Sequence, residues 1–401
     1  MSEQEKKPGR RLAQKDGLWT RYKTWLSGLS RGQKIRYRIL QIATIIALLI
    51  IIGFVALESW IRMPTLGDLP NQGEISLEES ELPAIAQSGR KAGVFTFLVA
   101  GKDVVSGGTD TMLLITYDTK EKKIYGVNLP RDTMINTTAT SKRLNAVYSR
   151  NRGSKDLPEK ERVEIGMQAL KKEVAKITGI MPDFYVLVEW EAIGELVDAI
   201  GGVYFEVPFL MEYNDAMQDL HIYQEPGYRL LKGTDAMQVI RFRKNDDRTI
   251  SLGDVGRLKI QQDFLKVVAK KCLQPATLLK LPELSKIFME NVTTDLTTSN
   301  ILALAQRAIG MDTENGVSFQ TLPLADSFLY KSAALVTLDA DKILEIVNDG
   351  MNPYLRDIEK SDLELVYRKS NGTFTVIGGQ SAISQSSSSS GSSTKPSGST
   401  S

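Results

Sequence analysis

The feature that most constrains this chain is an apolar run without any charge, ILQIATIIALLIIIGFVAL, at residues 39–57. At the rise of an α-helix, a run of this length matches the roughly 30 Å hydrocarbon core of a bilayer. A buried core helix and a cleaved signal peptide are the alternatives, but the run is longer than a signal core and no small-x-small cleavage site follows it. It predicts one transmembrane helix, which divides the rest of the chain between two sides of a membrane.

The charges beside this run give its orientation. Residues 1–38 contain eleven Lys and Arg against three Asp and Glu, a net charge of +8, whereas the whole chain carries +2. Because basic residues collect on the cytoplasmic side, we expect a single-pass cell-membrane protein with a cytoplasmic tail at 1–38 and everything after residue 57 outside. The tail is also suited to contact membrane lipid. The remainder has a net charge of −6, which argues against nucleic acid as a partner.

Composition divides the extracellular part. Residues 58–90 contain scattered Pro, Gly and acidic residues with little periodicity and are expected to form a stalk. A folded domain is predicted at 91–352, followed by a C-terminal segment at 353–380 and a disordered serine-rich tail at 381–401. Cys272 is the only cysteine and His221 the only histidine, so an intramolecular disulfide and a His-rich metal site are both excluded.

The periodicity of residues 91–352 predicts the fold. Strands are expected at 94–100, 112–117, 123–129, 184–188, 203–207, 239–243 and 317–322. Helices are expected at 161–177, 191–200, 254–272, 299–309 and 340–347. Strands that alternate with helices indicate an α/β fold, a layered α/β/α domain with a central mixed sheet.

Two loops at strand ends carry clustered polar residues. In GKDVVSGGTDTM, Asp103 and Asp110 flank a Gly-rich loop, and two carboxylates of this kind can hold Mg²⁺ together with waters and phosphates. In NLPRDT, Arg131 and Asp132 follow a proline that ends a strand, and ligand sites of α/β sheets lie beyond such edges. The alternatives are a hairpin loop whose aspartates bind turn backbone and a local ion pair.

The stretch at 239–261, VIRFRKNDDRTISLGDVGRLKIQ, is the third polar cluster. Alternation along the expected strand places Arg241 and Arg243 on one face, and helical spacing aligns Asp254, Arg257 and Gln261 in one stripe. A solvated, ion-paired surface is the alternative. Further down the same stripe lies an apolar slot, formed by Leu265, Val268 and Cys272.

Taken together, the arginines and acidic residues of these three clusters suggest a diphosphate site. Guanidinium groups bind phosphate oxygens in a bidentate manner and stabilise charge on a leaving phosphate. Phosphoryl transfer needs little more from a protein than positioning, charge and usually a metal. The sequence contains no nucleophile elbow, P-loop or HExxH motif that would indicate other chemistry.

Several motifs in a fixed order carry a family resemblance. With the single N-terminal span, they are GxD followed by TDTM, NLPRDT, KRLNAVYS, IMPDFYVLVEWEAIGELVDAIGGVYFEVP, GYRLLKGTDAMQVIRFR and GDVGRLKIQQ. This pattern resembles the LytR-CpsA-Psr family of cell-envelope proteins, from about residue 94 to 272 and more weakly to 348. The resemblance implies a phosphotransferase that attaches a glycopolymer, of the teichoic acid or capsular polysaccharide type, from an undecaprenyl diphosphate carrier to peptidoglycan.

The resemblance also implies roles for residues of this chain. Mg²⁺ would be ligated by Asp103 and Asp110, and the polyprenyl chain would lie in an apolar tunnel of the domain. Arg131 and Asp132 would be catalytic, with Asp132 either orienting Arg131 or assisting deprotonation of the acceptor hydroxyl. The diphosphate would be bound by Arg131, Arg241, Arg243, Arg257 and Gln261. Asp254 and Asn145 would support these site residues.

The chain departs from the family pattern where basic residues are usual. Gly108 opens Gly-Thr-Asp where the family often has Arg-Ser-Asp, and Ile260 stands where an arginine often precedes the glutamine pair. Four other arginines could compensate, although each also fits an ordinary surface charge, and they are Arg143, Arg150, Arg152 and Arg248. Two alternative functions stay open: a pyrophosphatase on the same lipid, and a non-catalytic regulatory protein that binds polyprenyl phosphates.

Overall fold

The computed structural model describes residues 63–64, 84–102, 108–216, 220–278, 280–312 and 314–383. The chain divides into two compact units, Met1–Arg62 and Met63–Ser401, and all described residues belong to the second. The span predicted at 39–57 lies outside the described residues. Within them, no helix has both the length and the apolar character needed to cross a membrane.

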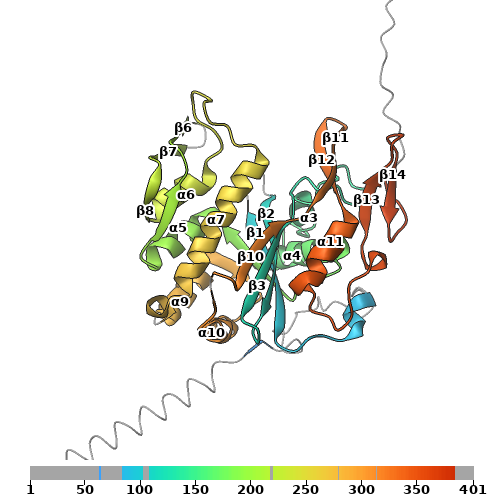
Figure 1. Cartoon of the computed structure of the whole chain (residues 1–401). Coiled ribbons are helices and arrows are strands. Elements are labelled where there is room, and N and C mark those ends of the chain that lie inside the picture. The colour runs from blue at the N-terminus through green and yellow to red at the C-terminus, as the bar shows by residue number, and fades with distance from the viewer. Residues whose placement is uncertain are drawn as a thin grey trace, which may run out of the picture. The chain divides into compact units, whose positions relative to one another are not determined.

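A six-stranded mixed sheet forms the centre of the domain (Figure 1). Its order is β10-β3-β2-β1-β4-β9, with β1 antiparallel to β2 and parallel to β4, and β3 parallel to β10. The central mixed sheet predicted from the sequence is therefore confirmed. Its strands are β1 (Val94–Lys102), β2 (Thr109–Asp118), β3 (Lys123–Asn128), β4 (Phe184–Glu189), β9 (Val292–Thr294) and β10 (Val317–Thr321).

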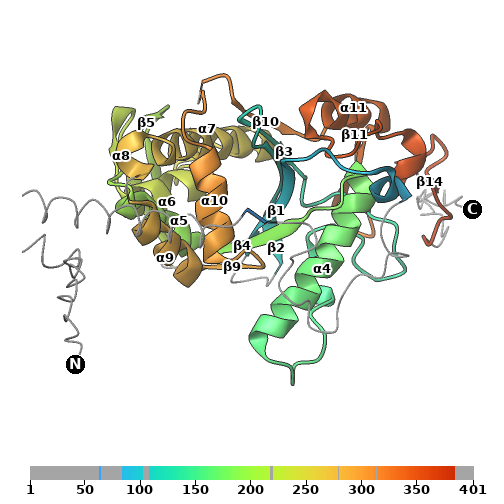
Figure 2. The ribbon, with the colours of Figure 1, turned by 90° about the horizontal axis from the view of Figure 1, so that it is seen from below.

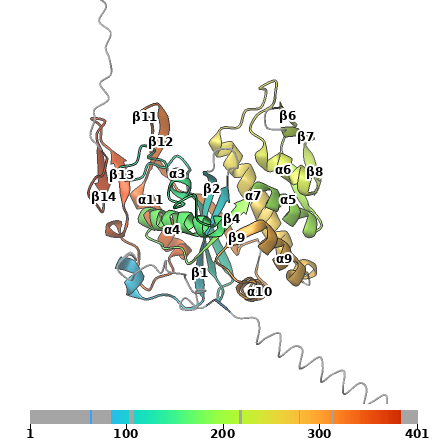
Figure 3. The same cartoon turned by 180° about the vertical axis from the view of Figure 1, so that it is seen from behind.

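Alternation along these strands gives the sheet two apolar faces. One face, with Leu98 and Leu114, is fully buried in a cluster that includes side chains of α4 (Glu159–Thr178) and α11 (Ala340–Ile346). The other face packs against α9 (Leu281–Asn291) and α10 (Thr298–Arg307). Figure 2 shows the strands between these helix layers, and Figure 3 shows α4 and α11 over the first face.

The remaining helices form a second body beside the sheet. Apolar side chains of α5 (Trp190–Ala199), α6 (Gly233–Arg241) and α7 (Asp254–Cys272) pack together in one cluster, which includes Ile240 and Phe264. The helix at 254–272 was correctly predicted. Among the described residues there are also two short α-helices, α3 (Ala146–Arg150) and α8 (Pro275–Leu278), and the short helical segments η3 (Val347–Met351) and η4 (Lys360–Asp362).

The strand predicted at 239–243 is wrong, because Val239, Ile240 and Arg241 end helix α6. Ala236, Val239 and Ile240 are buried with helical spacing, three and four residues apart, and this pattern overrides the short alternation in VIRFR. Phe242 then takes an extended conformation. Arg241 therefore lies in a helical last turn and Arg243 follows the helix, so the two do not share a strand face.

Four two-stranded ribbons surround the core. In β5–β8 and β6–β7, the strands are β5 (Val203–Val207), β8 (Gly227–Leu231), β6 (Met211–Asp215) and β7 (Leu220–Gln224). In β11–β12 and β13–β14, they are β11 (Leu324–Tyr330), β12 (Ala333–Leu338), β13 (Leu365–Arg368) and β14 (Phe374–Ile377). The last two ribbons share an apolar cluster that contains Phe328, Leu335 and Phe374.

Residues at both ends of the described chain join the core. Within the stretch expected to be a stalk, the 3-10 helix Ala84–Ser88 buries Ile85 completely. Arg90 then forms an ion pair with Asp183 at 2.6 Å. In the segment expected at 353–380, Tyr354 is fully buried in the same cluster as Ile85. The packed domain thus includes residues on both sides of 91–352.

Candidate functional site

The predicted site residues converge because four strands end at one edge of the sheet. β1, β3, β4 and β10 run in the same direction, so their carboxyl ends and the amino end of β2 share this edge. Arg131 follows β3, and Asp110 lies at the start of β2. At the same edge, Lys102 of β1 forms an ion pair with Glu189 of β4 at 2.8 Å. Ligands of α/β sheets bind beyond such edges.

Arg131 is the centre of a charged chain of four residues. Its Nη1 lies 3.2 Å from Oδ1 of Asp110, and its Nε lies 3.5 Å from Oδ2 of Asp132. The other oxygen of Asp132, Oδ1, lies 3.0 Å from Nε of Arg143. The four side chains are between 21% and 36% exposed, so they are in reach of a ligand. Two guanidinium groups are thereby fixed around one carboxylate.

Backbone hydrogen bonds hold the Arg131 segment from two sides. On one side, Asn145 N–H donates to the Arg131 carbonyl at 3.1 Å, and Thr109 N–H donates to the Asn145 carbonyl at 3.3 Å. On the other side, Val336 N–H of β12 donates to the Asp132 carbonyl at 3.0 Å. Asn145 thus links β2 to the Arg131 segment through its main chain, and its side chain makes no capping hydrogen bond to α3.

The residues of the third polar cluster lie around the start of α7. Gln261 donates from Nε2 to the Ile240 carbonyl at 3.0 Å, which fixes the second turn of α7 to the end of α6. Arg257 is half-buried in the first turn of α7, and Arg241 is half-buried at the end of α6. Arg243 is exposed. Asp254 is the first residue of α7, and its side chain lies outside the described part.

A neighbouring glutamine joins α7 to the sheet edge. Gln262 donates from Nε2 to Thr321 Oγ1 at 3.1 Å, at the end of β10. The next residue, Leu322, donates its N–H to the Asn128 carbonyl at the end of β3 at 3.0 Å. The second turn of α7 and the Arg131 segment therefore lie at the ends of two neighbouring strands, β10 and β3.

The two departures from the family pattern occupy buried positions. Ile260 is 9% exposed and packs in the apolar cluster with Phe205 and Phe264. Gly108 is buried just before β2. At position 260 the chain therefore has an apolar packing contact where an anion contact is usual.

Of the four arginines weighed as replacements, Arg143 is the one placed in the charged chain. Arg150 donates to the Ser141 carbonyl at 3.0 Å, and Arg152 forms an ion pair with Glu159. Arg248 is exposed and has a positive φ of 59°. The sequence contained a signal for Arg143, because it belongs to the same KRLNAVYS motif as Asn145.

The described part of the site fits a hydrated divalent cation through one carboxylate. Among the described residues, Arg131 donates a hydrogen bond to Oδ1 of Asp110, and no side-chain hydrogen bond there reaches Oδ2. Asp103 lies outside them. They contain no group of three or more His, Cys, Asp or Glu side chains arranged for a metal. Mg²⁺ commonly takes only one or two carboxylates and fills its remaining positions with water and phosphate oxygens, so Asp110 is compatible with it.

Apolar side chains on the α7 side of the sheet are incompletely covered. Val99, Ile115, Val188 and Phe319 are only half-buried on this face, whereas Leu98 and its neighbours on the opposite face are fully buried. Exposed apolar surface next to a polar site is typical of a ligand-binding face.

Cys272 lies at the far end of α7 and is no candidate nucleophile. Burial raises the pKa of its thiol to about 11, so the thiol is protonated at neutral pH. It packs against the cluster of Val268 and Phe264. Its contribution is packing, whereas the sequence had predicted an apolar slot at this end of the stripe; Val268 and Cys272 instead pack in the cluster shared with α5 and α6.

Comparison with known families gives an extensive match. The sequence model described as the LytR_cpsA_psr family matches residues 71–351. This range contains the charged chain around Arg131 and the whole of α7. The match ends before β13 and β14.

Curated relatives are similar at lower coverage. TagV of Bacillus subtilis (strain 168), named polyisoprenyl-teichoic acid–peptidoglycan teichoic acid transferase, is 29% identical over 229 residues, which cover 56% of this chain and 53% of TagV. MsrR of Staphylococcus aureus (strain COL), named a regulatory protein, is 25% identical over 240 residues, 59% of this chain and 66% of MsrR. The chain thus spans between half and two-thirds of the length of these relatives.

Two solved structures share the fold. The crystal structure of B. subtilis TagV aligns with a TM-score of 0.52 at 24% identity and covers 64% of this chain and 96% of that chain. The crystal structure of the protein gbs0355 from Streptococcus agalactiae aligns with a TM-score of 0.52 at 20% identity and covers 69% of this chain and 93% of that chain. Both have the mixed α/β arrangement described above.

Proposed function

Because the chain belongs to the LytR-CpsA-Psr family, we propose that it is a phosphotransferase that moves a cell-wall glycopolymer from an undecaprenyl diphosphate carrier to peptidoglycan. The name of its relative TagV, a teichoic acid transferase that acts between a polyisoprenyl carrier and peptidoglycan, supports this class of reaction. The observation that carries the proposal is the charged chain of Asp110, Arg131, Asp132 and Arg143 at the sheet edge.

The arrangement is suited to stabilise a diphosphate during transfer. Arg131 and Arg143 are planar cations held side by side through Asp132, and such forks bind phosphate oxygens with defined geometry. Arg241, Arg243 and Arg257 would contribute further positive charge from α6 and α7. These cations would offset the charge that develops on the bridging and leaving oxygens as the diphosphate breaks.

The reaction would be a single displacement at phosphorus. A sugar hydroxyl of the acceptor attacks the phosphorus nearer to the glycopolymer, forming a P–O bond, and the bridging P–O bond breaks to release polyprenyl phosphate. The hydroxyl proton passes to Asp132, which otherwise holds Arg131 and Arg143 in place. Mg²⁺ held by Asp110 and Asp103 would supply additional positive charge on the diphosphate oxygens when bound.

The half-buried apolar face below the charged chain suits the polyprenyl tail. Val99, Ile115, Val188 and Phe319 lie on the same side of the sheet as α7, which carries Arg257. A ligand with its diphosphate at the strand ends would place its hydrocarbon on this face and cover it. The span at 39–57 would anchor the protein in the cell membrane, with the domain outside and close to a lipid-borne donor.

The test is transfer by the full-length protein in detergent, with a lipid-linked glycopolymer and peptidoglycan as substrates. We expect Arg131→Ala and Arg257→Ala to lower transfer by roughly 100-fold or more, since each removes a cation that stabilises the transition state. Arg248→Ala, at an exposed turn, is the matched control and should transfer normally. Wild-type transfer by folded Arg131→Ala would contradict the assignment.

The products separate the alternative functions. A glycopolymer linked to peptidoglycan through a phosphodiester supports the transferase, whereas free phosphorylated glycan would indicate a pyrophosphatase. Tight lipid binding without turnover would indicate a regulatory protein. EDTA and Asp110→Asn should each abolish turnover if Mg²⁺ acts at this site, and excess Mg²⁺ should restore turnover after EDTA but not in the variant.

A further inference from the structure

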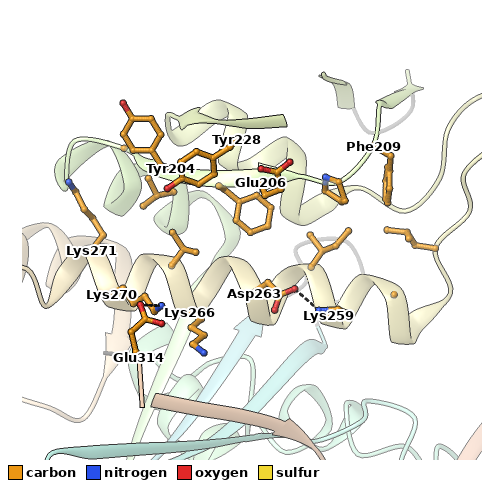
Figure 4. A pocket seen from close by; sticks show the side chains of 18 of the residues that line it. Tyr204, Glu206, Phe209, Tyr228, Lys259, Asp263, Lys266, Lys270, Lys271 and Glu314 are labelled. Carbon is orange, nitrogen blue, oxygen red and sulfur yellow. Dashed lines mark hydrogen bonds and ion pairs between the residues drawn. The ribbon is translucent and has the colours of Figure 1, made fainter. Parts of the chain in front are cut away.

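A groove of about 910 Å³ runs between α7 and the β5–β8 ribbon (Figure 4). Its lining is mostly apolar and includes Phe205, Ile260 and Val267. The first two belong to the buried cluster shared with α5 and α6, so the floor of the groove is a fixed part of the fold. A groove with an apolar floor and a few polar groups is the common form of a binding site.

Two exposed tyrosines stack on each other on the ribbon side of the groove. Tyr204 and Tyr228 lie on the paired strands β5 and β8 and are 55% and 69% exposed. Their rings are stacked, with centroids 5.6 Å apart and an interplanar angle of 23°. Figure 4 shows the two rings together above α7. An exposed aromatic patch of this kind on a soluble domain usually marks an interaction site.

The charges along the groove nearly balance, because four lysines and three acidic residues line it. Lys259 pairs with Asp263 at 2.8 Å, and Lys270 pairs with Glu314. Lys266 leaves α7 on the side away from the tyrosines in Figure 4. The groove therefore offers hydrogen-bonding groups without the high net positive charge that a phosphate-rich ligand would need.

The groove runs along the helix that carries Arg257, on a face of α7 that Arg257 does not line. Its lining begins on α7 at Gly256, adjacent to Arg257, and continues along the helix to Gln274 beyond its end. At about 1.5 Å per residue this distance is roughly 27 Å, enough for several sugar rings of an extended chain. A polymer lying in the groove would reach the turn of α7 that carries Arg257.

We propose that this groove binds the acceptor glycan strand of the reaction, a chain of uncharged N-acetylhexosamine rings. The inference rests on the proposed transferase function and adds a location for its acceptor. The C–H groups on one side of a pyranose ring carry partial positive charge and stack on the electron-rich face of a tyrosine. The sugar hydroxyls bind the paired Lys and Asp side chains, and the apolar floor accommodates the N-acetyl methyl groups.

Direct binding tests the proposal without relying on turnover. The probe is the chitin tetrasaccharide, four N-acetylglucosamine units, titrated into the full-length protein in detergent and followed by calorimetry. We expect Tyr204→Ala and Tyr228→Ala to weaken binding at least tenfold, and Tyr228→Phe to retain it because the ring remains. Tyr223→Ala is the matched control, since Tyr223 is 57% exposed on β7 and does not line the groove.

In the transfer assay, the two alanine variants should raise KM for the acceptor while leaving kcat at saturating acceptor and KM for the lipid donor unchanged. Arg131→Ala should bind the tetrasaccharide normally, so loss of Arg131-dependent transfer and loss of Tyr-dependent binding are separate results. Equal binding by wild type and both alanine variants would overturn the proposal. Tyrosine-dependent binding of phosphatidylglycerol vesicles, with no binding of the sugar, would also overturn it and identify a lipid surface.

Discussion

Asp132 lies between two guanidinium groups, and Arg143 is the one that sequence patterns had left among the surface charges. Oδ1 of Asp132 lies 3.0 Å from Arg143 and Oδ2 lies 3.5 Å from Arg131. Removing Arg143 would leave Asp132, which also contacts Arg131, with one partner fewer, and small displacements of a catalytic group are costly. Arg143 would therefore act partly by positioning Arg131 through Asp132.

For Arg143→Ala we expect a loss of transfer of roughly 10- to 100-fold, with unchanged thermal unfolding. Arg150→Ala is the control, because Arg150 is exposed on the same segment and binds only the Ser141 carbonyl among the described residues. Arg143→Lys should recover part of the rate, since it keeps the charge but not the planar fork. Equal losses in the alanine variants of Arg143 and Arg150 would refute a specific role.

Asp295 is a buried carboxyl outside the candidate site that should make stability depend on pH. Burial raises its pKa to about 6, although Lys171, 3.9 Å away, and the N–H of Tyr185 act in the opposite direction. A folded pKa above the unfolded value means that the acid form is favoured in the fold. Its contribution is therefore complete below about pH 4 and is lost as pH rises through 6.

Thermal unfolding of the wild type and Asp295→Asn between pH 4 and 7.5 measures this effect. Relative to the variant, the wild type should lose stability on the order of 1–3 kcal/mol as pH rises through this window. Asp312→Asn is a useful comparison, because hydrogen bonds from Asn315 and the backbone lower the pKa of that exposed carboxyl. A difference between wild type and Asp295→Asn that stays constant with pH would disprove the assignment.

At the scale of elements, α7 connects the charged site, the apolar cluster and the groove. Gln261 and Gln262 fix its second turn to α6 and to β10, while Ile260 faces the cluster with Phe264. Isoleucine at position 260 therefore serves packing. An arginine there would lose these apolar contacts, and because Ile260 lines the groove its side chain would extend into the groove.

We expect Ile260→Arg to lower the free energy of unfolding by roughly 1–3 kcal/mol without raising transfer, although it restores the residue usual in the family. Ile260→Val is the control for packing alone and should cost about 1 kcal/mol. Thermal unfolding measures the stability of both variants, and the transfer assay measures their rates. An arginine variant that unfolds like the wild type and transfers faster would show that position 260 can contact the phosphates.

Sequence patterns identified the long or strongly apolar elements, including α7, α4 and five of the six strands of the central sheet, but not the short edge strand β9. They failed for the end of α6, because five residues of VIRFR fit either periodicity and packing against α5 and α7 decides between them. The ribbons β11–β12 and β13–β14 were missed because short pairs depend on contacts distant in sequence.

For the site, the order of the motifs predicted that Arg131, Asp132 and Asp110 lie close together. In the structure these three side chains are in contact. The sequence could not show that Gln261 binds the Ile240 carbonyl or that Asp132 is shared with Arg143, because both depend on how separate segments approach one another. The roles of Asp103 and Asp254 stay predictions, since the structure leaves their side chains undescribed.

At the scale of the whole domain, residues beyond the family match reach the candidate site. Phe374 of β14 packs on Phe328 and Tyr330 of β11, with ring centroids 5.5 and 5.6 Å apart. The same cluster includes Met134, three residues after Arg131. Asn136 donates to the Gln380 carbonyl at 2.9 Å. The C-terminal ribbon therefore supports the segment that carries Arg131.

Phe374→Ala should destabilise the domain by about 3 kcal/mol through the cavity it leaves, and it should also lower transfer at temperatures where the domain remains folded. Tyr367→Ala is the control, since Tyr367 is 49% exposed on the neighbouring strand β13. Hydrogen exchange at Met134 and Asn136 should rise only in the Phe374 variant. Unchanged exchange there would contradict the link between the C-terminal ribbon and the site.

The hydrogen bonds from Asn145 and Val336 to the Arg131 segment have a consequence for sequence divergence. Both contacts are made by main-chain atoms, at 3.1 Å and 3.0 Å, so they persist when the side chains at positions 145 and 336 are replaced by others that keep the backbone path. Mutations can therefore accumulate around the arginine without displacing it. Relatives that differ at three-quarters of their aligned positions, as MsrR does at 25% identity, could thus retain the same placement of this cation.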